Sequence, residues 1–354
     1  MLSADVVVIG AGVSGLVAAK NLVEKGQSVI CIEKARGTGG RLSSKRVNSD
    51  NAVIGESELW SFDLGASSFK AVTPEFRLLL LCLVEKGRML TDGTEFWPAS
   101  RSSSFTRYLS ESVDLRCAQK ISKIEKTDQG WLTFTEDEGG RLVAFSLSKT
   151  LILATPPEQA YDLIPSDHSY KVRLESVKTQ AQWVSSYLLD RNTAAALGIQ
   201  PEDAFIYDDC KVDNRSEVER SVFRRIVVET QKEGRESDEN RVVVKVEASP
   251  WWSESKMDWE KAEVAELLWK ELIAQRTNDT AATSLAWIVQ HTHRWLYSLP
   301  QENPLKGSLF LPQENGLSLC GDYLAIDTVY ARDEILEGVE AAFISGLALS
   351  KSFL

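Results

Sequence analysis

The sequence has few of the residues that build metal centres or disulfide frameworks. Its 354 residues include 3 histidines and 5 cysteines, and no two cysteines share a Cys-x-x-Cys spacing. Cys31 and Cys320 lie inside apolar runs, which is typical of buried free thiols. An odd, scattered set of cysteines favours a reducing compartment, so we expect a cytoplasmic protein without a bound metal.

Long apolar runs and an excess of positive charge are also missing. The most apolar stretch, FRLLLLCLVEKG, is much shorter than the ~20 residues that a membrane-spanning helix needs. The first predicted strand begins by Asp5, which leaves no room for a signal peptide. The 51 acidic residues outnumber the 40 basic ones and give a net charge of −11, which argues against a general nucleic-acid binder. We therefore expect neither a membrane nor a nucleic acid as a partner.

The chain begins with a strand, a glycine-rich turn, a helix and a second strand. The opening reads DVVVIGAGVSGLVAAKNLVEKGQSVICIEKA. Residues 6–9 form a continuous apolar run, as in a parallel strand that is buried on both faces. Apolar residues at helical spacing follow up to Val23, Gly26 ends the helix, and residues 28–32 form the next strand. This order predicts a βαβ unit.

Three glycines in the turn match the pattern G-x-G-x-x-G between a strand and a helix. Gly10 permits the tight turn, Gly12 lets the backbone approach a pyrophosphate at the helix N-terminus, and Gly15 permits close packing of helix on strand. Glu33 ends the second strand, where a carboxylate can accept hydrogen bonds from an adenosine ribose. The alternative is an ordinary glycine-rich turn with a surface glutamate.

A second glycine-rich stretch, EKARGTGGRLSSKR, concentrates positive charge in an acidic protein. The amides of Gly39 and Gly40 can line a phosphate, and Arg41 can add a charge-assisted hydrogen bond. A Rossmann unit that binds a nicotinamide dinucleotide does not need this stretch. A protein that binds a dinucleotide with a larger second half does need it. GTGGR resembles the second fingerprint of FAD enzymes of the glutathione-reductase-like, amine-oxidase branch. A flexible surface loop and a nucleic-acid patch are the alternatives, and nothing else in the chain supports the latter.

Motifs from both ends and the middle of the chain resemble the bacterial renalase-like flavoproteins, relatives of the flavin amine oxidases. The matching pieces are VVVIGAGVSGLVAAKNL, EKARGTGGRLSSKR, FDLGA, TLILATPPEQA, HRWLY, CGD and EGVEAAFISG. The resemblance implies non-covalently bound FAD and oxidation of isomeric dihydronicotinamide forms of NAD(P). Hydride would pass to flavin N5, and O2 would be the acceptor that yields hydrogen peroxide. Because a dihydronicotinamide has no proton to remove, few catalytic residues are needed.

The resemblance also indicates which residues contact FAD. The strand in LSLCGDYL would place Asp322 on the ribityl chain, and the helix near Gly338 would point its N-terminus at the flavin pyrimidine. The segment 323–337 between them is longer than the usual connection and is interpreted as an insertion. The predicted cofactor-binding residues are Gly10, Gly12, Val13, Ser14, Gly15, Glu33, Lys34, Gly39, Gly40, Arg41, Leu64, Gly65, Ala66, Ile121, Ala154, Gly321, Asp322 and Val339.

The expected fold class is α/β, with a Rossmann-type FAD-binding domain (glutathione-reductase-like, amine-oxidase branch) and a second, mixed-sheet substrate domain. The FAD-binding domain is discontinuous and takes residues 1–70, 101–165 and 300–354. The substrate domain takes residues 71–100 and 166–299, and the active site should lie between the two. The further predicted elements are an antiparallel meander that ends in an apolar strand at 150–154, strands at 183–189, 204–207, 222–229, 241–247 and 284–290, a helix within 256–275 and a C-terminal helix.

Departures from the family pattern fall in segments that are expected to face the substrate. Relatives usually have a glutamine after the D-x-G-A turn, where this chain has Ser67. They have a glycine at the position of Arg101 and a histidine at that of Glu247. Because the cofactor motifs are intact, this pattern predicts a flavoprotein and leaves open whether its substrate is that of the renalases.

Aromatic side chains are the candidates for a wall over the flavin. The candidate pocket residues are Trp97, Trp252, His293, Trp295 and Tyr297. Ordinary core packing is the alternative for each tryptophan, and a structural histidine is the alternative for His293. Lys45 and Arg46 could contact FAD phosphates or substrate, or could face solvent.

The sequence leaves three functions open. The first is a renalase-like FAD oxidoreductase that acts on a reduced nicotinamide compound. The second is a flavin amine oxidase or desaturase-like enzyme on another small substrate. Such an enzyme would need an aromatic pair at the flavin and commonly a lysine near flavin N5. No motif of this sequence places a lysine there. The third is a non-catalytic FAD-binding protein, which the departures at Ser67, Arg101 and Glu247 keep open.

Overall fold

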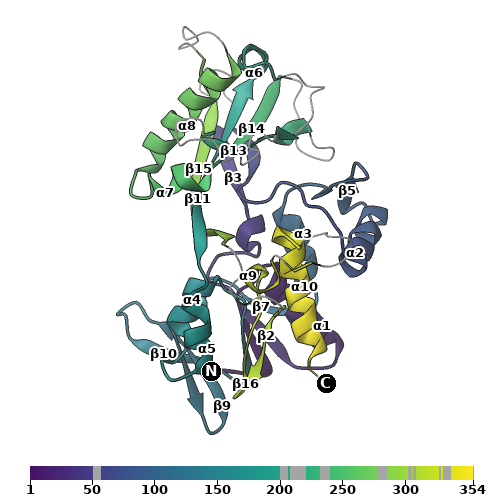
Figure 1. The fold of residues 1–354 in the computed structure, drawn as a ribbon, viewed down its shortest axis with the longest axis vertical. Coiled ribbons are helices and arrows are strands. Elements are labelled where there is room, and N and C mark those ends of the chain that lie inside the picture. Colours follow the sequence, from purple (N-terminus) through teal and green to yellow (C-terminus); the bar gives the residue numbers. More distant parts are fainter. Residues whose placement is uncertain are drawn as a thin grey trace.

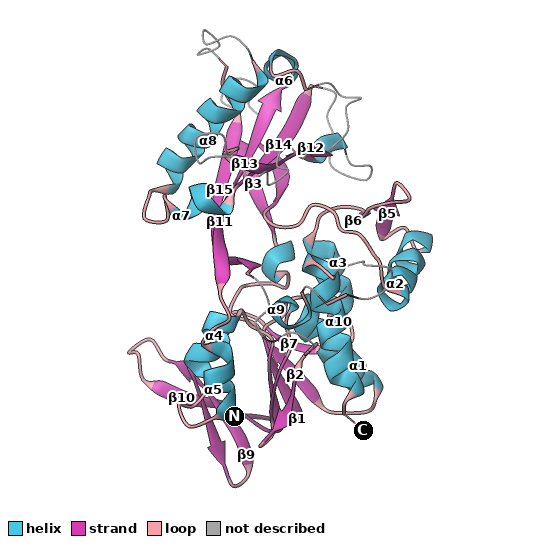
Figure 2. Ribbon diagram, viewed as in Figure 1, coloured by secondary structure: helices cyan, strands magenta, loops and turns pink. Residues whose placement is uncertain are grey.

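The computed structural model describes residues 1–50, 57–199, 206–207, 221–231, 240–277, 285–301, 305, 308–326, 328–329 and 336–353. These residues form two lobes, drawn as ribbons in Figures 1 and 2. One lobe carries both termini around a large mixed sheet, and the other is built on a second sheet with helix α8 along it. This is an α/β architecture that starts with a Rossmann-type unit, as the sequence predicts.

The large sheet has eight strands, and its parallel part has the order β17-β10-β1-β2-β7. The bounds are β1 Leu2–Ile9, β2 Val29–Ile32, β7 Asp114–Arg116, β8 Lys123–Thr127, β9 Gly130–Glu136, β10 Leu142–Leu153, β16 Leu311–Glu314 and β17 Leu317–Leu319. The predicted meander is confirmed as β8, β9 and β10. Its final strand is not separate, because β10 pairs antiparallel with β9 over residues 142–148 and parallel with β1 over residues 146–153.

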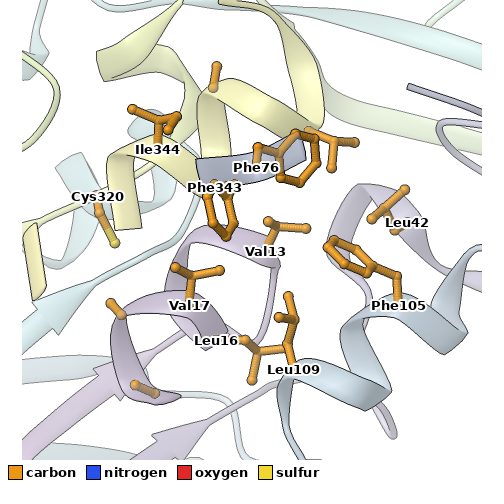
Figure 3. Packing of buried hydrophobic residues seen from close by; sticks show 14 of the residues in the cluster. Val13, Leu16, Val17, Leu42, Phe76, Phe105, Leu109, Cys320, Phe343 and Ile344 are labelled. Carbon is orange, nitrogen blue, oxygen red and sulfur yellow. The ribbon is translucent and has the colours of Figure 1, made fainter. Parts of the chain in front are cut away.

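Helices α1 (Val13–Glu24) and α10 (Gly338–Lys351) lie side by side on one face of this sheet, and α10 confirms the predicted C-terminal helix. Figure 3 shows their apolar side chains interleaved, with Phe343 pointing toward α1. The two backbones approach closely at Gly346, where a Cβ would lie 2.2 Å from the Ser14 carbonyl oxygen. The contact therefore depends on the absence of a side chain in the middle of α10.

Helices α4 (Pro157–Leu163) and α5 (Ser169–Leu174) cover the opposite face of the sheet. Alternate residues of β1 supply the two cores, so that Val7 packs under α4 and α5 while Val8 packs under α1. Because both faces are covered, the strand is apolar along its buried half. Tyr170 of α5 belongs to this core, although residues 166–299 were expected in the substrate domain.

Residues 71–100 also differ from the expected division of domains. Helix α2 (Pro74–Glu85) buries Phe76 in the core that holds α1, and the hairpin of β5 (Met89–Thr91) and β6 (Phe96–Pro98) packs into the same core. By these contacts the segment lies with the Rossmann lobe and not with the second sheet. An amphipathic helix carries an apolar face, but its sequence does not say which core that face joins.

Five antiparallel strands form the second sheet, in the order β12-β13-β14-β11-β15. The bounds are β11 Thr179–Asp190, β12 Ile206–Tyr207, β13 Phe223–Val228, β14 Arg241–Ala248 and β15 Val289–Pro300. The strands predicted at 183–189, 222–229 and 241–247 are confirmed. The strand predicted at 284–290 is wrong in position, because β15 begins at Val289. We expected a mixed sheet, and every pairing that the structure describes in it is antiparallel.

The remaining described elements complete the two lobes. They are α3 Ser103–Leu109, α6 Arg191–Ala196, α7 Pro250–Glu254, α8 Lys261–Arg276 and α9 Asp322–Ala325, with short 3-10 turns at Gly40–Leu42 and Glu229–Gln231. Helix α8 confirms the helix predicted within 256–275, and with α7 it packs on one face of the second sheet. Within the described ranges, no helix combines the length and the hydropathy that crossing a bilayer requires.

A two-stranded ribbon joins the lobes. β3 (Ser44–Asp50) pairs antiparallel with β4 (Ser57–Asp63), and both belong to the segment predicted for the FAD-binding domain. Trp60 and Phe62 of this ribbon are buried against Leu188 of the second sheet. The chain therefore runs from the second glycine-rich stretch directly into β3, and the ribbon packs against one face of the second sheet.

Gly346→Ala tests the close contact between α10 and α1. The new Cβ would meet main-chain atoms of Ser14, so we expect the free energy of unfolding to fall by about 1–3 kcal/mol in urea or thermal unfolding. Gly139→Ala is the matched control, because its nearest neighbour is the flexible side chain of Asp137 in an exposed turn. The control should change the free energy by less than about 0.5 kcal/mol. Equal losses in the two variants would contradict the packing described here.

Candidate cofactor and substrate site

The turn between β1 and α1 contains two kinds of glycine. A Cβ on Gly10 would lie 2.6 Å from the Ala154 carbonyl oxygen, and one on Gly15 would lie 2.1 Å from the Gly10 carbonyl oxygen. The packing role predicted for Gly15 is therefore confirmed. Gly12, the N-cap of α1, has no neighbour within 4 Å of a Cβ. Its open side lies at a helix N-terminus, where an anion such as a pyrophosphate can bind.

Glu33 follows β2, and its carboxylate joins two turns. Oε2 accepts a hydrogen bond of 2.8 Å from Ala11 N, and Oε1 accepts one of 2.8 Å from Ala35 N. A carboxylate can accept about four hydrogen bonds, so capacity remains for ribose hydroxyls. The ribose contact stays a prediction, and the structure adds a role in holding the first turn. Lys34, its neighbour, is exposed and donates to Gln159.

The second glycine turn and the D-L-G-A turn lie against the first turn. Gly39 N donates to Ala11 O at 3.2 Å, which ties the second glycine turn to the first. A Cβ on Gly65 would lie 1.8 Å from the Arg41 carbonyl oxygen, so the D-L-G-A turn touches the second glycine turn directly. The structure thus brings together three turns that are separate in the sequence, beside the N-terminus of α1.

Arg41 and Asp322 were each predicted to bind FAD, and in the structure they bind each other. Arg41 Nη2 donates to Asp322 Oδ1 at 2.5 Å, Nη1 donates to Oδ2 at 2.8 Å, and Nη1 also donates to Ser298 O at 2.7 Å. Burial lowers the pKa of the Arg41 guanidinium, but Asp322 raises it, and the net direction is upward. The pair links the second glycine turn, the end of the C-terminal strand and β15. Sequence reasoning missed it because the partners are 281 positions apart.

The C-terminal strand is shorter than the sequence predicts. β17 stops at Leu319 and α9 starts at Asp322, so LSLCGDYL is a strand followed by a helical turn. Gly321 N donates to Ser345 Oγ at 2.9 Å, which fastens this transition to α10. Val339 is buried in the first turn of α10, in the core with α1. Within the expected insertion, the structure describes residues 323–326, 328–329 and 336–337.

The other predicted cofactor residues lie in several places. Val13 and Ser14 are buried in the first turn of α1, and Leu64 and Ala66 lie in the D-L-G-A turn. Ile121 is buried in the core under α4 and α5. Four of these five residues are therefore close to the three turns, and Ile121 has a packing role on the other face of the sheet.

Three buried polar atoms near the turns have no hydrogen-bond partner: Thr155 Oγ1, Glu158 Oε2 and Tyr323 OH. Thr155 follows Ala154, which contacts Gly10, Tyr323 follows Asp322, the partner of Arg41, and the charge of Glu158 helps to raise the pKa of Arg41. Buried polar atoms in proteins are normally paired. A ligand rich in hydroxyl and phosphate oxygens would supply partners here, and the open side of the first turn leaves room for it. The residues present therefore fit a bound dinucleotide.

The second sheet turns a polar face toward these turns. Ser186 of β11 lies opposite Lys245 on β14 and His291 on β15. Two residues earlier in β11, Val184 lies opposite Glu247 on β14 and His293 on β15. Residues at such opposite positions share one face of a sheet. The other face is apolar and packs on α7 and α8. We call the polar face the roof.

Two roof residues bond directly to the D-L-G-A turn. Lys245 Nζ donates to Gly65 O at 2.6 Å, and Trp295 Nε1 donates to Leu64 O at 2.8 Å. Burial raises the pKa of Glu247 beside them, but Lys245 and then two arginines lower it, with a net decrease. The roof is therefore attached to the same turn that touches Arg41.

The structure brings two of the five predicted pocket residues together. The rings of His293 and Trp295 are 4.3 Å apart between centroids and meet edge to face at 67°. Tyr297 continues the same strand and is half-buried. Trp252 lies in the apolar core under α8, on the far face of the sheet, so it does not join the roof. Trp97 is buried in the β5–β6 hairpin.

Two roof histidines are neutral at neutral pH. Burial, followed by the charges of Lys45 and Lys261, lowers the pKa of His291 to about 4, and burial, followed by Lys261 and His291, lowers that of His293 to about 4. Lys45, whose role the sequence left open, therefore lies near the edge of the roof, while Arg46 is exposed. Among the described residues, no three or more His, Cys, Asp or Glu side chains are grouped so that they could hold a metal ion.

A comparison with protein families finds a Rossmann unit at the start of the chain. The matching family is described as an NAD(P)-binding Rossmann-like domain, and the match covers residues 8–80. This range includes the three turns that meet at α1. It is consistent with a dinucleotide site and does not distinguish one dinucleotide from another.

Solved structures of oxidases share the whole fold. A protein from Exiguobacterium sp. 255-15, provisionally named a protoporphyrinogen oxidase, matches with a TM-score of 0.64 at 13% identity, over 99% of this chain and 98% of that chain. A putrescine oxidase variant from a redesign of cofactor binding matches with a TM-score of 0.62 at 11% identity, over 99% and 97%. Cyclohexylamine oxidase from Brevibacterium oxydans IH-35A matches with a TM-score of 0.58 at 11% identity, over 99% and 98%.

At these identities the likeness establishes the fold. The chain is an α/β protein with a Rossmann-type domain and a second sheet, in the arrangement that these oxidases share. The fold-class prediction is therefore confirmed.

Gly12→Val tests the dinucleotide site. The valine side chain would extend into the open side of the turn, so we expect a bound dinucleotide, flavin where that dinucleotide is FAD, to be lost while the free energy of unfolding falls by no more than about 1 kcal/mol. Flavin absorbance after gel filtration measures the first quantity, and urea unfolding of the flavin-free proteins measures the second. A variant that retains flavin normally would show that the site lies elsewhere.

Acidification should destabilise the protein between pH 6.5 and about 4. Because the pKa of His291 and His293 is about 4 in the folded chain against 6.5 ordinarily, the unfolded chain binds more protons in this window. The free energy of unfolding is therefore highest above pH 6.5 and falls as the pH falls. Thermal unfolding of the wild type and of His293→Asn across this window measures the effect, and the variant should lose less. Identical losses would contradict a half-buried, neutral His293.

Proposed function

We propose that this protein is a renalase-like FAD oxidoreductase that takes a hydride from a reduced nicotinamide compound, an isomeric dihydro form of NAD(P), with O2 as the acceptor. The observation that carries the proposal is the stack of three turns at the N-terminus of α1, held against the roof by Lys245 and Trp295. A dinucleotide along these turns would begin at the open side of Gly12 and end near the roof.

Five residues or positions would hold FAD without a covalent bond. Gly12 and the N-terminus of α1 would hold the pyrophosphate, Glu33 the adenosine ribose, Asp322 the ribityl chain, and Val339 with the start of α10 the flavin pyrimidine. Arg41 has five donors, of which the contacts to Asp322 and Ser298 leave part free for a phosphate oxygen. Bound there, FAD would supply a hydride acceptor that O2 can reoxidise with release of hydrogen peroxide.

The roof suits a donor that needs no base. His291 and His293 are weak bases, because burial lowers their pKa to about 4. A dihydronicotinamide releases hydride without losing a proton, so the roof has only to orient the ring and to exclude water. The positive charges of Lys45 and Lys261 act on the roof histidines, which favours a donor that carries phosphates over a protonated amine.

An amine oxidase is the second candidate. Two of the similar structures are named as a putrescine oxidase and a cyclohexylamine oxidase. The observation in this chain that favours the candidate is the buried Lys245 beside Gly65, since amine oxidation commonly uses a lysine near the flavin. Against it stand the lysines at the roof edge, because a protonated amine would be repelled there.

A reducing, cytoplasmic compartment is also part of the proposal. The described cysteines, Cys31, Cys82, Cys117 and Cys320, are all free thiols. Burial, followed by nearby anionic groups, raises the pKa of Cys31, and burial raises that of Cys320 to about 12. Thiols held in this way are unreactive, which suits a packing role.

Anaerobic mixing with three kinds of donor tests the function. The flavin-loaded protein is mixed separately with isomeric dihydronicotinamides, with ordinary NAD(P)H and with amines, and the loss of flavin absorbance is followed. We expect the isomers to reduce the flavin at least about 100-fold faster than the other donors, because in this proposal the roof orients their ring and nearby lysines attract their phosphates. Hydrogen peroxide should then appear once O2 is admitted.

The other results decide between the alternatives. Reduction by amines alone would overturn the proposal in favour of the amine oxidase. Reduction by none of the donors, in protein that holds FAD, would favour the non-catalytic FAD-binding protein. If ordinary NAD(P)H were the best donor, the proposed hydride transfer would stand and the proposed specificity for the isomers would be wrong.

A further inference from the structure

Lys245 lies in the middle of β14 with a fully buried side chain, 0% exposed. Its Nζ donates to Gly65 O at 2.6 Å and to Ser67 Oγ, and it lies 3.0 Å from Glu247 Oε1. An ammonium group has three donors, and these three acceptors use all of them. The side chain is therefore held in one orientation between the roof and the D-L-G-A turn.

Glu229, in the 3-10 turn after β13, completes this group. Ser67 Oγ donates to Glu229 Oε1 at 2.7 Å, and Lys245 Nζ lies 3.6 Å from the same oxygen. Arg224 Nη1 lies 3.6 Å from Glu247 Oε2 at the outer side. We call Ser67, Glu229, Lys245 and Glu247 the Lys245 cluster, and all four residues are almost completely buried.

A buried charged cluster is a poor device for stability. Moving an ammonium and two carboxylates out of water costs about as much as their attraction returns, and apolar residues of similar volume often serve as well. Such a cluster is better suited to defining a geometry, because its hydrogen bonds are directional. Here the hydrogen bonds from Lys245 and Glu229 to the other lobe end on Gly65, in the turn that touches Arg41, and on Ser67 just after it.

Two departures from the renalase-like pattern meet in the cluster. Ser67 stands where relatives usually have a glutamine, and Glu247 stands where they have a histidine. In the structure both residues contact the same atom, Lys245 Nζ. The two departures are therefore one coupled feature of this chain, located where the roof meets the D-L-G-A turn.

We propose that Lys245 is a positioning residue that fixes the distance between the D-L-G-A turn and the roof, and with it the space for a donor beside the cofactor. The inference rests on the proposed function for the identity of the cofactor and the donor. The placement of the turn itself rests on the hydrogen bonds given above. Its test therefore includes a readout that needs no turnover.

Three variants separate positioning from stability. Ser67→Ala removes one hydroxyl and leaves the charges of the cluster paired. The triple variant Glu229→Gln, Lys245→Met, Glu247→Gln removes three charges with little change in side-chain volume. Lys149→Met is the control, because it removes an exposed lysine ion pair with Asp5 at the far end of the large sheet.

Two measurements follow the turn in each folded variant: hydrogen exchange of the amides of residues 63–69, and visible circular dichroism of bound FAD. We expect exchange to accelerate about tenfold in the triple variant and about threefold in Ser67→Ala, with a changed flavin spectrum, and the control to match the wild type. If the triple variant does not fold, Ser67→Ala decides. Wild-type exchange and spectrum in the folded variants would overturn the proposal.

Failure of the proposed function would look different. If no donor reduces the flavin, or if no FAD binds, hydrogen exchange still reports whether the cluster holds the turn. If a donor is found, Ser67→Ala should slow flavin reduction at saturating donor about tenfold while changing donor affinity less than about threefold. A loss of donor affinity alone would contradict a positioning role.

Discussion

Contact of main chain with main chain at the carboxyl end of β1 is the constraint on which the rest of the structure depends. Gly10 lies against the carbonyl of Ala154, Gly15 lies against Gly10, and Gly346 brings α10 onto the start of α1. None of these contacts leaves room for a Cβ, so the first turn, the end of β10 and the C-terminal helix are locked together. Gly12, in the same turn, keeps an open side at the helix N-terminus, and this combination favours a dinucleotide there.

The elements that could be predicted from the sequence are those whose signal is local. The apolar run before Gly10, the glycine spacing and the helical spacing after it specify β1 and α1 without reference to the rest of the chain. β15 was placed too early, because LAWIVQ is mostly apolar whereas HTHRWLYSLP begins with four polar residues. Its polar face is the roof, so the feature that obscured the strand is the one that carries the candidate function. The core that α2 joins depends on tertiary contacts alone.

The charged contacts were missed for a related reason. Arg41 and Asp322 were each assigned to the cofactor from a separate motif, and only the fold shows that the two motifs converge on one ion pair. For Lys245 a local signal exists, since a lysine and a glutamate two positions apart in VVVKVEA must share one face of a buried strand. Its partners, Gly65 and Ser67, could not be read from the sequence, because they depend on how the lobes meet.

The central claim is that the stacked turns form an FAD site that reaches the roof. Titration of the flavin-free protein with FAD, FMN and NAD+, followed by calorimetry, tests it most directly. The account predicts one FAD per chain and FMN binding at least about 100-fold weaker, because FMN lacks the pyrophosphate and the adenosine that α1 and Glu33 would hold. Since the second glycine turn would serve the flavin half, NAD+ should also bind more weakly. Equal affinity for FMN and FAD, or no binding of either flavin, would contradict the account.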